Sequence, residues 1–319
     1  MPSTETIDLV VLGYSERLSD DHDVILSVAR EHGLRAQLVT PSQVSLHIDG
    51  TGEHVRVHGQ RLTPRAVVPR GVNRPWPMLK QILECWYSDG AQIVPSITAA
   101  DICADKITTT RALSRAGVPT LPTIGIVPGP HVALEALEIP TDTELLSKPA
   151  RGSKARGVRR YTDARNAHQA LVENHSLQDG IVDHQVVQPL ASDAGIDYRV
   201  VVAGAPTPRV IAVTRRIAPS GDFVTNRPNA IVEDCDDCLD EISDVVDVAI
   251  RAAQALGLVF GGIDVITHNG QAVVLETNAW PGLAVQHRGD TLARALVNEV
   301  MTALQQKNLQ HVSAQLFHQ

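Results

Sequence analysis

Several features that indicate particular classes of protein are scarce or missing from this sequence. It has only four cysteines in 319 residues, too few for the disulfide framework of a small secreted protein. No apolar run is long enough to cross a bilayer. The N-terminal residues do not combine a basic segment with an apolar one, as an export signal does. These absences predict a cytoplasmic protein without a membrane partner.

The sequence also lacks any dense tract of lysine and arginine. Its 28 basic and 36 acidic residues give a formal net charge of −8. Nucleic-acid-binding domains usually concentrate positive charge on one face, so we expect no nucleic-acid partner. The chain is 43% hydrophobic, which is enough for a large core, and its length predicts two or three domains.

Two of the cysteines form a close pair, in the segment Cys235-Asp236-Asp237-Cys238. Such a pair can be half of a zinc site or a redox pair. The other two cysteines do not form a second close pair, and the neighbouring aspartates disfavour a thiolate. An acidic surface loop is therefore the favoured interpretation.

The hydrophobic pattern predicts an α/β protein in three parts. In residues 1–97, apolar strands alternate with helical segments around a hairpin, and the first strand does not lead into the GxGxxG pattern of dinucleotide-binding domains. Residues 98–188 are expected to contain a helix from Asp101 to Ala116, followed by a strand, a basic loop and a strand. Residues 189–319 are rich in strands, with helices at about 241–256 and 290–305.

Acidic residues occur on both strands of the last predicted hairpin. Asp264 precedes the turn at Asn269-Gly270, and Glu276 and Asn278 follow it on one face of the second strand. A two-residue turn would pair position 264 with 275 and place the two acids on opposite faces. A three-residue loop, or a bulge, would restore the same face.

If these three residues act together, the hairpin is predicted to have the odd-length loop. Two carboxylates and an amide oxygen suit a hard cation such as Mg²⁺. Without nearby histidine or cysteine ligands, zinc is disfavoured. The alternative is that Asp264 and Glu276 are unrelated residues at strand ends, and the hairpin by itself does not decide between the two.

Basic residues interrupt several apolar segments. Lys148 ends the strand at Leu145-Leu146 and precedes the basic loop Gly152–Gly157. Backbone N–H groups of such a loop, with a lysine, can bind phosphate. The Walker pattern is absent, and a solvated turn is the alternative. Lys106 lies on the predicted helix 101–116, where a lone lysine is usually a surface residue.

Arginines also lie within or beside predicted strands. Arg199, Arg215 and Arg216 interrupt apolar strands, which is costly unless anions are near. Arg70 and Arg74 stand beside Trp76 at the end of another strand. A substrate carboxylate could pair with these two arginines, and a basic surface turn is the alternative.

The order of these segments resembles the ATP-grasp superfamily and, within it, the RimK type of carboxylate–amine ligase. The resemblance covers about residues 99–304. It rests most on Gly261-Gly262-Ile263-Asp264 followed, twelve residues later, by the segment that begins Glu276-Thr277-Asn278. It implies an ATP-grasp fold preceded by a Rossmann-like pre-ATP-grasp domain, with residues 98–188 as the lid subdomain and 189–319 as the subdomain with the metal site.

The resemblance also implies a role for individual residues. Lys106 and Lys148 would contact the phosphates of ATP, and the loop with Gly152, Ser153 and Gly157 would close over them. The remaining implied sites are an adenine-binding hinge (Gln188, Pro189, Leu190), an acid near the ribose (Asp197), a nucleotide contact (Asn226), catalytic arginines (Arg215, with Arg199 as a second candidate), and ligands for Mg²⁺, or alternatively Mn²⁺ (Asp264, Glu276, Asn278).

The implied activity is an ATP-dependent, ADP-forming ligation of an acid to an amine through an acyl phosphate. One substrate is expected to be an amino acid or peptide, and the family often forms dimers or tetramers. The sequence departs from the family at Gln188 (commonly Glu), at Val224 (commonly Arg) and across Arg227–Ala230, so the substrates do not transfer. A phosphotransferase acting on a hydroxyl and a non-catalytic nucleotide-binding module are the alternatives.

Overall fold

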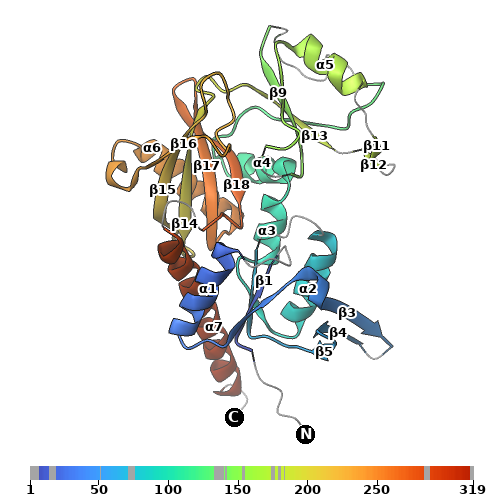
Figure 1. Ribbon diagram of the computed structural model, residues 1–319, viewed down its shortest axis with the longest axis vertical. Coiled ribbons are helices and arrows are strands. Elements are labelled where there is room, and N and C mark those ends of the chain that lie inside the picture. Colours follow the sequence, from blue (N-terminus) through green and yellow to red (C-terminus); the bar gives the residue numbers. More distant parts are fainter. Residues whose placement is uncertain are drawn as a thin grey trace.

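The computed structural model is a mixed α/β protein (Figure 1). The described residues are 7–13, 19–50, 52–70, 76–132, 140, 142–152, 155–173, 177–178, 181–182, 184–283 and 288–316. Helices make up 35% and strands 31%, which confirms the predicted α/β class. Within these ranges no helix combines the length and the apolar character needed to span a membrane.

The N-terminal part of the chain forms a parallel sheet with the strand order β2-β1-β6-β7. Every residue of β1 and β6 is buried, as expected for parallel strands that are covered on both faces. The elements are β1 (Leu9–Leu12), α1 (Asp20–Glu31), β2 (Ala36–Val39), β6 (Ala66–Pro69), α2 (Trp76–Ser88) and β7 (Gln92–Ile93). The short helix η1 (Pro41–Gln43) leads into a separate antiparallel sheet of β3 (Val44–Asp49), β4 (Gly52–Val57) and β5 (Gln60–Arg61), which contains the predicted hairpin.

The central part of the chain forms a small antiparallel sheet, which we call the lid sheet. Its order is β10-β9-β13-β8, and α5 covers one face, where Leu145 and Val187 pack against Leu171. Its elements are β8 (Ile124–Ile126), β9 (Leu145–Pro149), β10 (Arg159–Tyr161), α5 (Ala164–Glu173) and β13 (Gln185–Pro189). A two-stranded hairpin, β11 (Leu177–Gln178) and β12 (Ile181–Val182), precedes β13.

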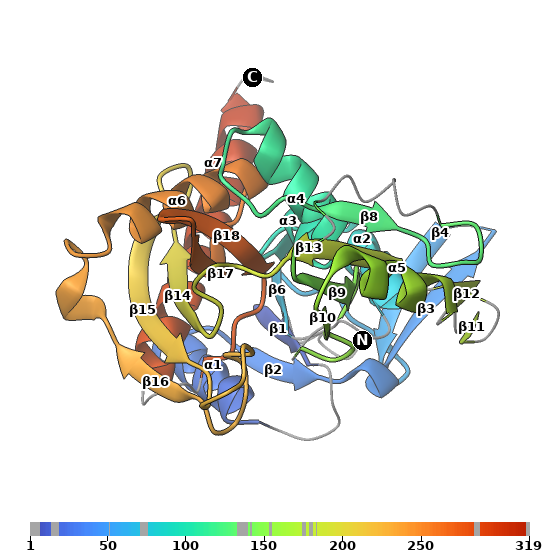
Figure 2. The ribbon, with the colours of Figure 1, turned by 90° about the horizontal axis from the view of Figure 1, so that it is seen from above.

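The C-terminal part forms a five-stranded antiparallel sheet, the large sheet, with the order β16-β15-β14-β17-β18. Its strands are β14 (Ile196–Ala203), β15 (Arg209–Ile217), β16 (Ile231–Asp234), β17 (Phe260–His268) and β18 (Gln271–Asn278). Helix α6 (Ser243–Leu256) packs on the face that bears Val200, Val213 and Ile263. Helix α7 (Gly289–Leu316) packs on the other face, against Val201 and Phe260. Seen from above, the large sheet and the lid sheet lie side by side (Figure 2).

The predicted helix from Asp101 to Ala116 is two helices. Helix α3 (Ile97–Cys103) begins four residues before the predicted start at Asp101 and is capped by Ser96, which accepts a hydrogen bond from the Ala99 N–H. Helix α4 (Lys106–Arg115) is capped by Asp105, which accepts from the Thr108 N–H. The break at Asp105 places Lys106 at the first residue of a helix, where its side chain can reach the neighbouring loop.

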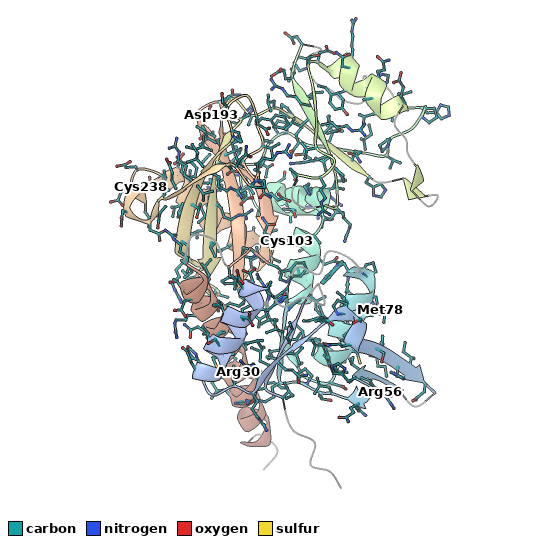
Figure 3. All side chains as sticks on the ribbon, in the orientation of Figure 1. Arg30, Arg56, Met78, Cys103, Asp193 and Cys238 are labelled. Carbon is teal, nitrogen blue, oxygen red and sulfur yellow. The ribbon has the colours of Figure 1, made fainter. Side chains whose placement is uncertain are left out.

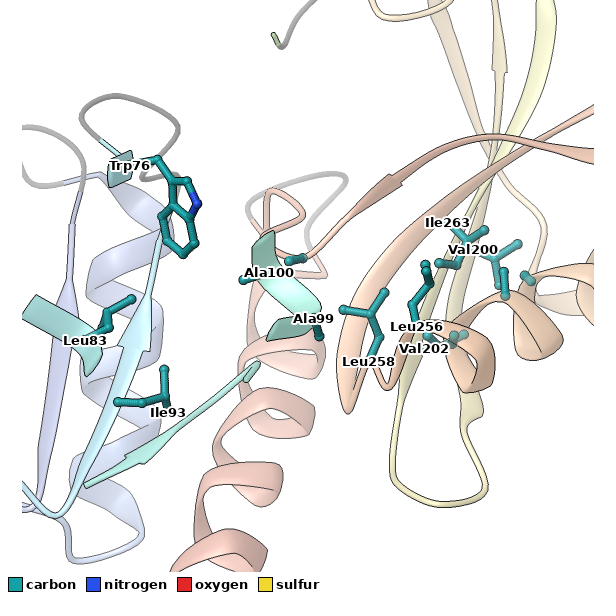
Figure 4. Close-up of a cluster of buried hydrophobic side chains, with 14 of the residues drawn as sticks. Trp76, Leu83, Ile93, Ala99, Ala100, Val200, Val202, Leu256, Leu258 and Ile263 are labelled. Carbon is teal, nitrogen blue, oxygen red and sulfur yellow. The ribbon is translucent and has the colours of Figure 1, made fainter. Parts of the chain in front are cut away.

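One hydrophobic core runs from the parallel sheet to the large sheet. Trp76, Leu83 and Ile93 lie on one side of α3, and Val200, Leu258 and Ile263 lie on the other, as Figure 4 shows. The small residues Ala99 and Ala100 of α3 are buried between them, which lets this helix pack closely against both sides. This core includes residues on both sides of the predicted domain boundary at 97/98. The boundaries at 97/98 and 188/189 stay predictions.

Candidate active site

A pocket lies between the lid sheet and the large sheet. Strand β9 and the loop after it line one side, and β14, β15, β17 and β18 line the other, with α4 at one end. The pocket brings together residues that the sequence separates by as many as 170 positions, from Lys106 to Glu276. Of the predicted site residues it includes Lys106, Lys148, Gly152, Asp197, Asn226, Asp264 and Glu276.

The two acids of the last hairpin are brought together by a bulge. The turn has only two residues, because His268 pairs with Gln271, and both Asn269 and Gly270 have positive φ. The predicted odd-length loop is therefore wrong. Val265 pairs with Val274 and Asp264 with Glu276, which leaves Leu275 as an extra residue. This bulge, the stated alternative, puts Asp264 and Glu276 on one face.

Asp264 is held by two arginines. Its carboxylate accepts hydrogen bonds from Arg199 Nε at 2.8 Å and Arg199 Nη2 at 2.7 Å, and Arg216 Nη2 lies 2.9 Å from Oδ2. Burial alone would raise the pKa of Asp264, but the two guanidinium groups outweigh burial and hold the pKa at about 2. Asp264 is therefore ionised throughout the physiological range.

Asp197 and Arg216 form a buried bidentate pair next to Asp264. Arg216 donates to the two Asp197 oxygens at 2.7 and 2.6 Å, and Thr225 Oγ1 donates to Asp197 Oδ2 at 2.7 Å. Asp197 is only 1% exposed. This acid, predicted to lie near a ribose, thus has both oxygens engaged by protein groups, and its contact in this structure is with Arg216.

Arg215 lies outside the pocket. It pairs with Glu233 on β16, Nη1 to Oε2 at 3.0 Å, and shares the α6-facing side of the large sheet with Val213. Because side chains alternate along a strand, the pocket receives Arg216 instead. The pocket is therefore lined by Arg216 and not by Arg215, the predicted catalytic arginine, and the catalytic roles stay predictions. Side chains alternate along β14, which puts Asp197 and Arg199 on one face, and Arg216 is the residue of β15 that pairs with Asp197. This alternation was the signal that could have identified Arg216.

Two lysines approach the pocket from its other side. Lys106 Nζ lies 3.2 Å from the Gly152 carbonyl oxygen and 3.4 Å from Glu276 Oε1. Lys148 is buried, and it makes no ion pair with any residue that the structure describes. Burial lowers its pKa to about 8, against the opposing effect of Glu276. A buried ammonium without a close counter-ion is suited to binding an anion.

The loop between β9 and β10 covers part of the pocket. Gly152 lines it, and Gly157 has φ +75° and lies so close to Pro149 that a Cβ atom there would be 2.9 Å from Pro149 Cγ. Glycine is therefore required at position 157 for both conformation and space. Ser153, predicted to bind phosphate, lies outside the described residues.

The predicted hinge, Gln188-Pro189-Leu190, ends β13 beside the pocket. Gln188 lines a smaller adjoining cavity that shares Lys106, Lys148 and Glu276 with the pocket. Its Nε2 donates to Thr123 Oγ1 at 2.7 Å, and its buried Oε1 has no hydrogen-bond partner among the described residues. An acceptor in this state is available to a ligand. Asn226 is exposed at the pocket's rim.

The predicted substrate-binding arginine at position 70 is not at an exposed strand end. Arg70 is 4% exposed, and its Nη2 donates to Asp21 Oδ2 at 2.8 Å and to the Pro281 carbonyl oxygen at 2.7 Å. These protein contacts take the place of the proposed substrate carboxylate. Arg74 lies outside the described residues.

The cysteine pair is part of a short turn at the edge of the large sheet. Cys235 precedes the helical turn η3 (Asp236–Cys238) and Cys238 ends it, and all four cysteines are free. Figure 3 shows Cys238 at the outer edge of the molecule and Cys103 near its centre. The described residues contain no group of three or more His, Cys, Asp and Glu side chains placed to hold a metal.

Comparison with known proteins identifies the family. The model of the RimK-like ATP-grasp domain matches residues 103–300, which include the lid sheet, the large sheet and the pocket between them. The chain belongs to the RimK-like ATP-grasp family. It is an ATP-dependent ligase that forms amide bonds, and ligases of this family use ATP with Mg²⁺.

Relatives and solved structures of ATP-grasp proteins agree with this result. The chain is 26% identical over 265 residues to a probable alpha-L-glutamate ligase of Enterobacter sp. (strain 638), which covers 81% of this chain and 83% of the relative. A RimK domain ATP-grasp protein of Sphaerobacter thermophilus has the same fold, with a TM-score of 0.65 and 18% identity over 92% of this chain and 99% of that one. The ATP-grasp ligase PsnB, solved with a precursor variant, Mg and ADP, has a TM-score of 0.63 and 20% identity over 93% and 99%.

Proposed function

We propose that the pocket binds ATP with Mg²⁺ and transfers the γ-phosphoryl group to a substrate carboxylate, which an amino acid or peptide amine then attacks. The observation that carries this proposal is the composition of the pocket. Four cationic side chains (Lys106, Lys148, Arg156, Arg216) and three carboxylates (Asp197, Asp264, Glu276) line it from facing elements. The excess of positive charge suits a polyphosphate, and the carboxylates suit its counter-ion.

The nucleotide is proposed to lie between the two sheets. Lys148 and Lys106 would bind its phosphates, under the loop that contains Gly152 and Gly157. The base would lie beside the hinge at Gln188–Leu190, close to Leu146 and Leu275, which line the pocket with apolar surface. The buried, unsatisfied Oε1 of Gln188 supports a base with a hydrogen-bond donor at this place.

The proposed Mg²⁺ ligands are Asp264, Glu276 and Asn278. Glu276 faces the pocket and is one-third exposed, so its carboxylate is accessible. Asp264 Oδ1 accepts one hydrogen bond and keeps a lone pair for a further ligand. Asn278 is half-buried, and its Nδ2 has no hydrogen-bond partner among the described residues. These oxygen donors fit a hard cation, which when bound would neutralise charge on the phosphates; Mn²⁺ is expected to substitute.

The protein's own side chains would do the rest of the work by position and charge. A carboxylate is a poor acyl donor because its leaving group is an oxide, and phosphorylation supplies a better one. Arg216 and Lys148 would offset the negative charge that develops during transfer. The bidentate contacts of Arg216 to Asp197 and of Arg199 to Asp264 hold both guanidinium groups in place before substrates arrive. The loop would exclude water that hydrolyses an acyl phosphate.

The acid and the amine are proposed only by class. The relative named as a glutamate ligase supports glutamate as the first amine to test. PsnB, which was solved with a precursor, supports a peptide as the second substrate class. A homo-oligomer, dimeric or tetrameric, also remains a prediction.

The test is Mg²⁺-dependent release of ADP from ATP across a matrix of amino acids and small acids or peptides, with mass spectrometry of the products. The expected result is ADP release that requires both an acid and an amine, with a product lighter by one water than their sum. Release that needs an acceptor without an amine, with a stable phosphorylated product, would assign a phosphotransferase instead. Nucleotide binding without turnover under any pair would contradict the ligase.

A further inference from the structure

A buried polar bridge joins the N-terminal parallel sheet to the loop that follows β18. Arg70 comes directly after β6, and its backbone N–H donates to Leu12 O at 2.9 Å, which extends the parallel ladder. Its guanidinium group, almost fully buried, contacts the Asp21 carboxylate and the Pro281 carbonyl oxygen at 2.8 and 2.7 Å. Arg70 thereby links residues that lie 49 and 211 positions away in the chain.

Asp21 completes the bridge from the first turn of α1. While Oδ2 accepts from Arg70, Oδ1 accepts from the Leu283 backbone N–H at 3.0 Å. The two residues therefore hold the backbone on both sides of Gly282: Arg70 at the carbonyl before it and Asp21 at the amide after it. Two directed contacts across one glycine fix the path of this loop more narrowly than apolar packing does.

The held loop packs through Pro281 on β17, the strand that bears Asp264. A Cβ atom added at Gly262 would lie 3.1 Å from Pro281 Cβ and 3.9 Å from Arg199 Cδ, so the proline ring packs on Gly262 beside Arg199. Gly262 in turn pairs with Asn278 across β17 and β18. The bridge is thus separated from a proposed metal ligand, Asn278, and from the arginine that binds Asp264 by a single layer of packed atoms.

Apolar contacts already attach this loop to the N-terminal part of the chain. Leu283 is fully buried with Ile25 of α1, and the rings of Trp280 and Trp76 are 5.4 Å apart. Replacing a buried ion pair with apolar residues is often neutral or stabilising, so a buried pair is weak evidence for a role in stability. Its directed geometry points to a role in placing the loop.

We propose that Asp21 and Arg70 are positioning residues: they hold Pro281–Leu283 so that Asn278 and Arg199 keep their places on the face of the large sheet that bears Asp264. The expected effect on turnover rests on the proposed function. The contacts that form the bridge do not depend on that function. The positioning role also replaces a substrate-binding role for Arg70.

The first experiment measures the bridge directly, by amide hydrogen exchange in the full chain. In Asp21→Ala, exchange of the Leu283 amide is expected to be about tenfold faster or more, because its acceptor is gone. Asp21→Asn, which keeps an acceptor oxygen for Leu283, is expected to stay closer to the wild type. Asp20→Asn is the matched control, since Asp20 is an exposed acid in the same helical turn. Unchanged protection of Leu283 in Asp21→Ala overturns the bridge.

The second experiment measures its consequence for turnover. Asp21→Ala and Arg70→Gln are each expected to lower kcat about 10- to 100-fold, with the KM of every substrate changed by less than about threefold. The double variant is expected to fall no further, because the two residues act as one unit. If Arg70→Gln proves too unstable to purify, the two Asp21 variants carry the test.

Two results would overturn the positioning role. One is a raised KM for the acid alone in Arg70→Gln with normal kcat in Asp21→Ala, which would assign Arg70 to substrate binding. The other is full activity in Asp21→Ala despite fast exchange at Leu283. A wild-type chain that forms no amide contradicts the proposed function, and the exchange experiment then still decides whether the bridge holds the loop.

Discussion

Arg215 and Arg216 are adjacent in the sequence, and the structure assigns them to different regions. Arg215 lies on the α6-facing side of the large sheet, partly exposed, with one contact to Glu233. Arg216 lies on the opposite side, buried, and joins the two carboxylates of the pocket. Both sides are apolar at one end of the sheet, but only the side of Arg216 becomes a charged pocket at the other. Whether a charged residue of β15 lies in the pocket thus depends on which face of the strand its side chain occupies.

The largest expected effect comes from the pocket acid. Glu276→Gln is expected to lower amide formation about a thousandfold, because a metal ligand and a counter-charge are lost together. Its ion pair with Lys106 is partly exposed, so the free energy of unfolding should change by less than about 1 kcal/mol. Steady-state kinetics and thermal unfolding check this. The matched control is Glu233→Gln on the other side of the sheet, and an equal loss of rate there would remove the contrast between the two sides.

The second effect compares the arginines themselves. Arg216→Lys keeps the charge but loses the planar fork that holds Asp197, and we expect a rate about a hundredfold lower. Arg216→Met should also destabilise the fold by about 3 kcal/mol, because it leaves two buried carboxylates short of a partner. Arg215→Met is expected to change the rate by less than about threefold. Denaturant unfolding and steady-state kinetics measure the two effects. Similar losses in the two methionine variants would contradict the proposal that Arg216, and not Arg215, acts in the pocket.

A smaller effect is the pH dependence that Lys148 gives to the pocket. Because burial lowers its pKa to about 8, the free enzyme loses this positive charge as pH rises through that value. The kcat/KM for ATP is therefore expected to fall above about pH 8, up to tenfold for each further pH unit. Lys148→Arg, which stays charged, should flatten the profile. A wild-type profile that is level to pH 9.5 would show that Lys148 does not bind the nucleotide in its charged form.

The same shift affects stability with the opposite sign. The folded pKa of Lys148 is lower than its unfolded pKa, so the unfolded chain binds more protons between about pH 8 and pH 10.5. The contribution of this residue to stability therefore rises with pH across that window. Denaturant unfolding at several pH values should show this rise in the wild type and not in Lys148→Met.

The smallest effect is expected from the cysteine pair, at the outer edge of the large sheet. Burial raises the pKa of the Cys235 thiol, and Cys238 donates from Sγ to the Cys235 carbonyl oxygen at 3.3 Å. Neither cysteine lines the pocket. The double change Cys235→Ala and Cys238→Ala should leave kcat within about twofold, with no zinc in the purified wild type by elemental analysis. One equivalent of zinc, or a large loss of rate, would restore a functional role for the pair.

Much of the fold followed from local patterns in the sequence. Strand β6 (Ala66–Pro69) coincides with a short apolar run between polar residues, the pattern expected of a buried strand. Helix α6 ends at Gly257, whose φ of +62° is the left-handed cap expected of glycine. The break between α3 and α4 was missed because Ala104-Asp105 contains neither glycine nor proline. The Asp105-to-Thr108 cap was the only local signal.

The site was predicted less completely, because its geometry depends on contacts between distant segments. Asn269-Gly270 specified a two-residue turn by its local preference, and that preference prevailed over the predicted odd length. The bulge at Leu275, and the face of the sheet on which Arg216 lies, depend on how the strands pair. Neither can be predicted from one strand alone. Arg70 looked like a surface residue because its partners, Asp21 and Pro281, lie far from it in the sequence. The proposed ligand roles and the domain boundaries stay predictions.

The bulge at Leu275 has a practical consequence for engineering this chain. Since Leu275 supplies the extra residue, the pairing of Asp264 with Glu276 does not depend on how many residues connect the strands. A reporter peptide inserted between Asn269 and Gly270, both exposed, is expected to leave the two acids opposite each other. Deleting Leu275 would remove the bulge and place Glu276 directly after Val274, so Glu276 would still pair with Asp264 on the same face. An insertion at the tip of this hairpin and the loss of its one extra residue are therefore both expected to leave the two acids on the same face.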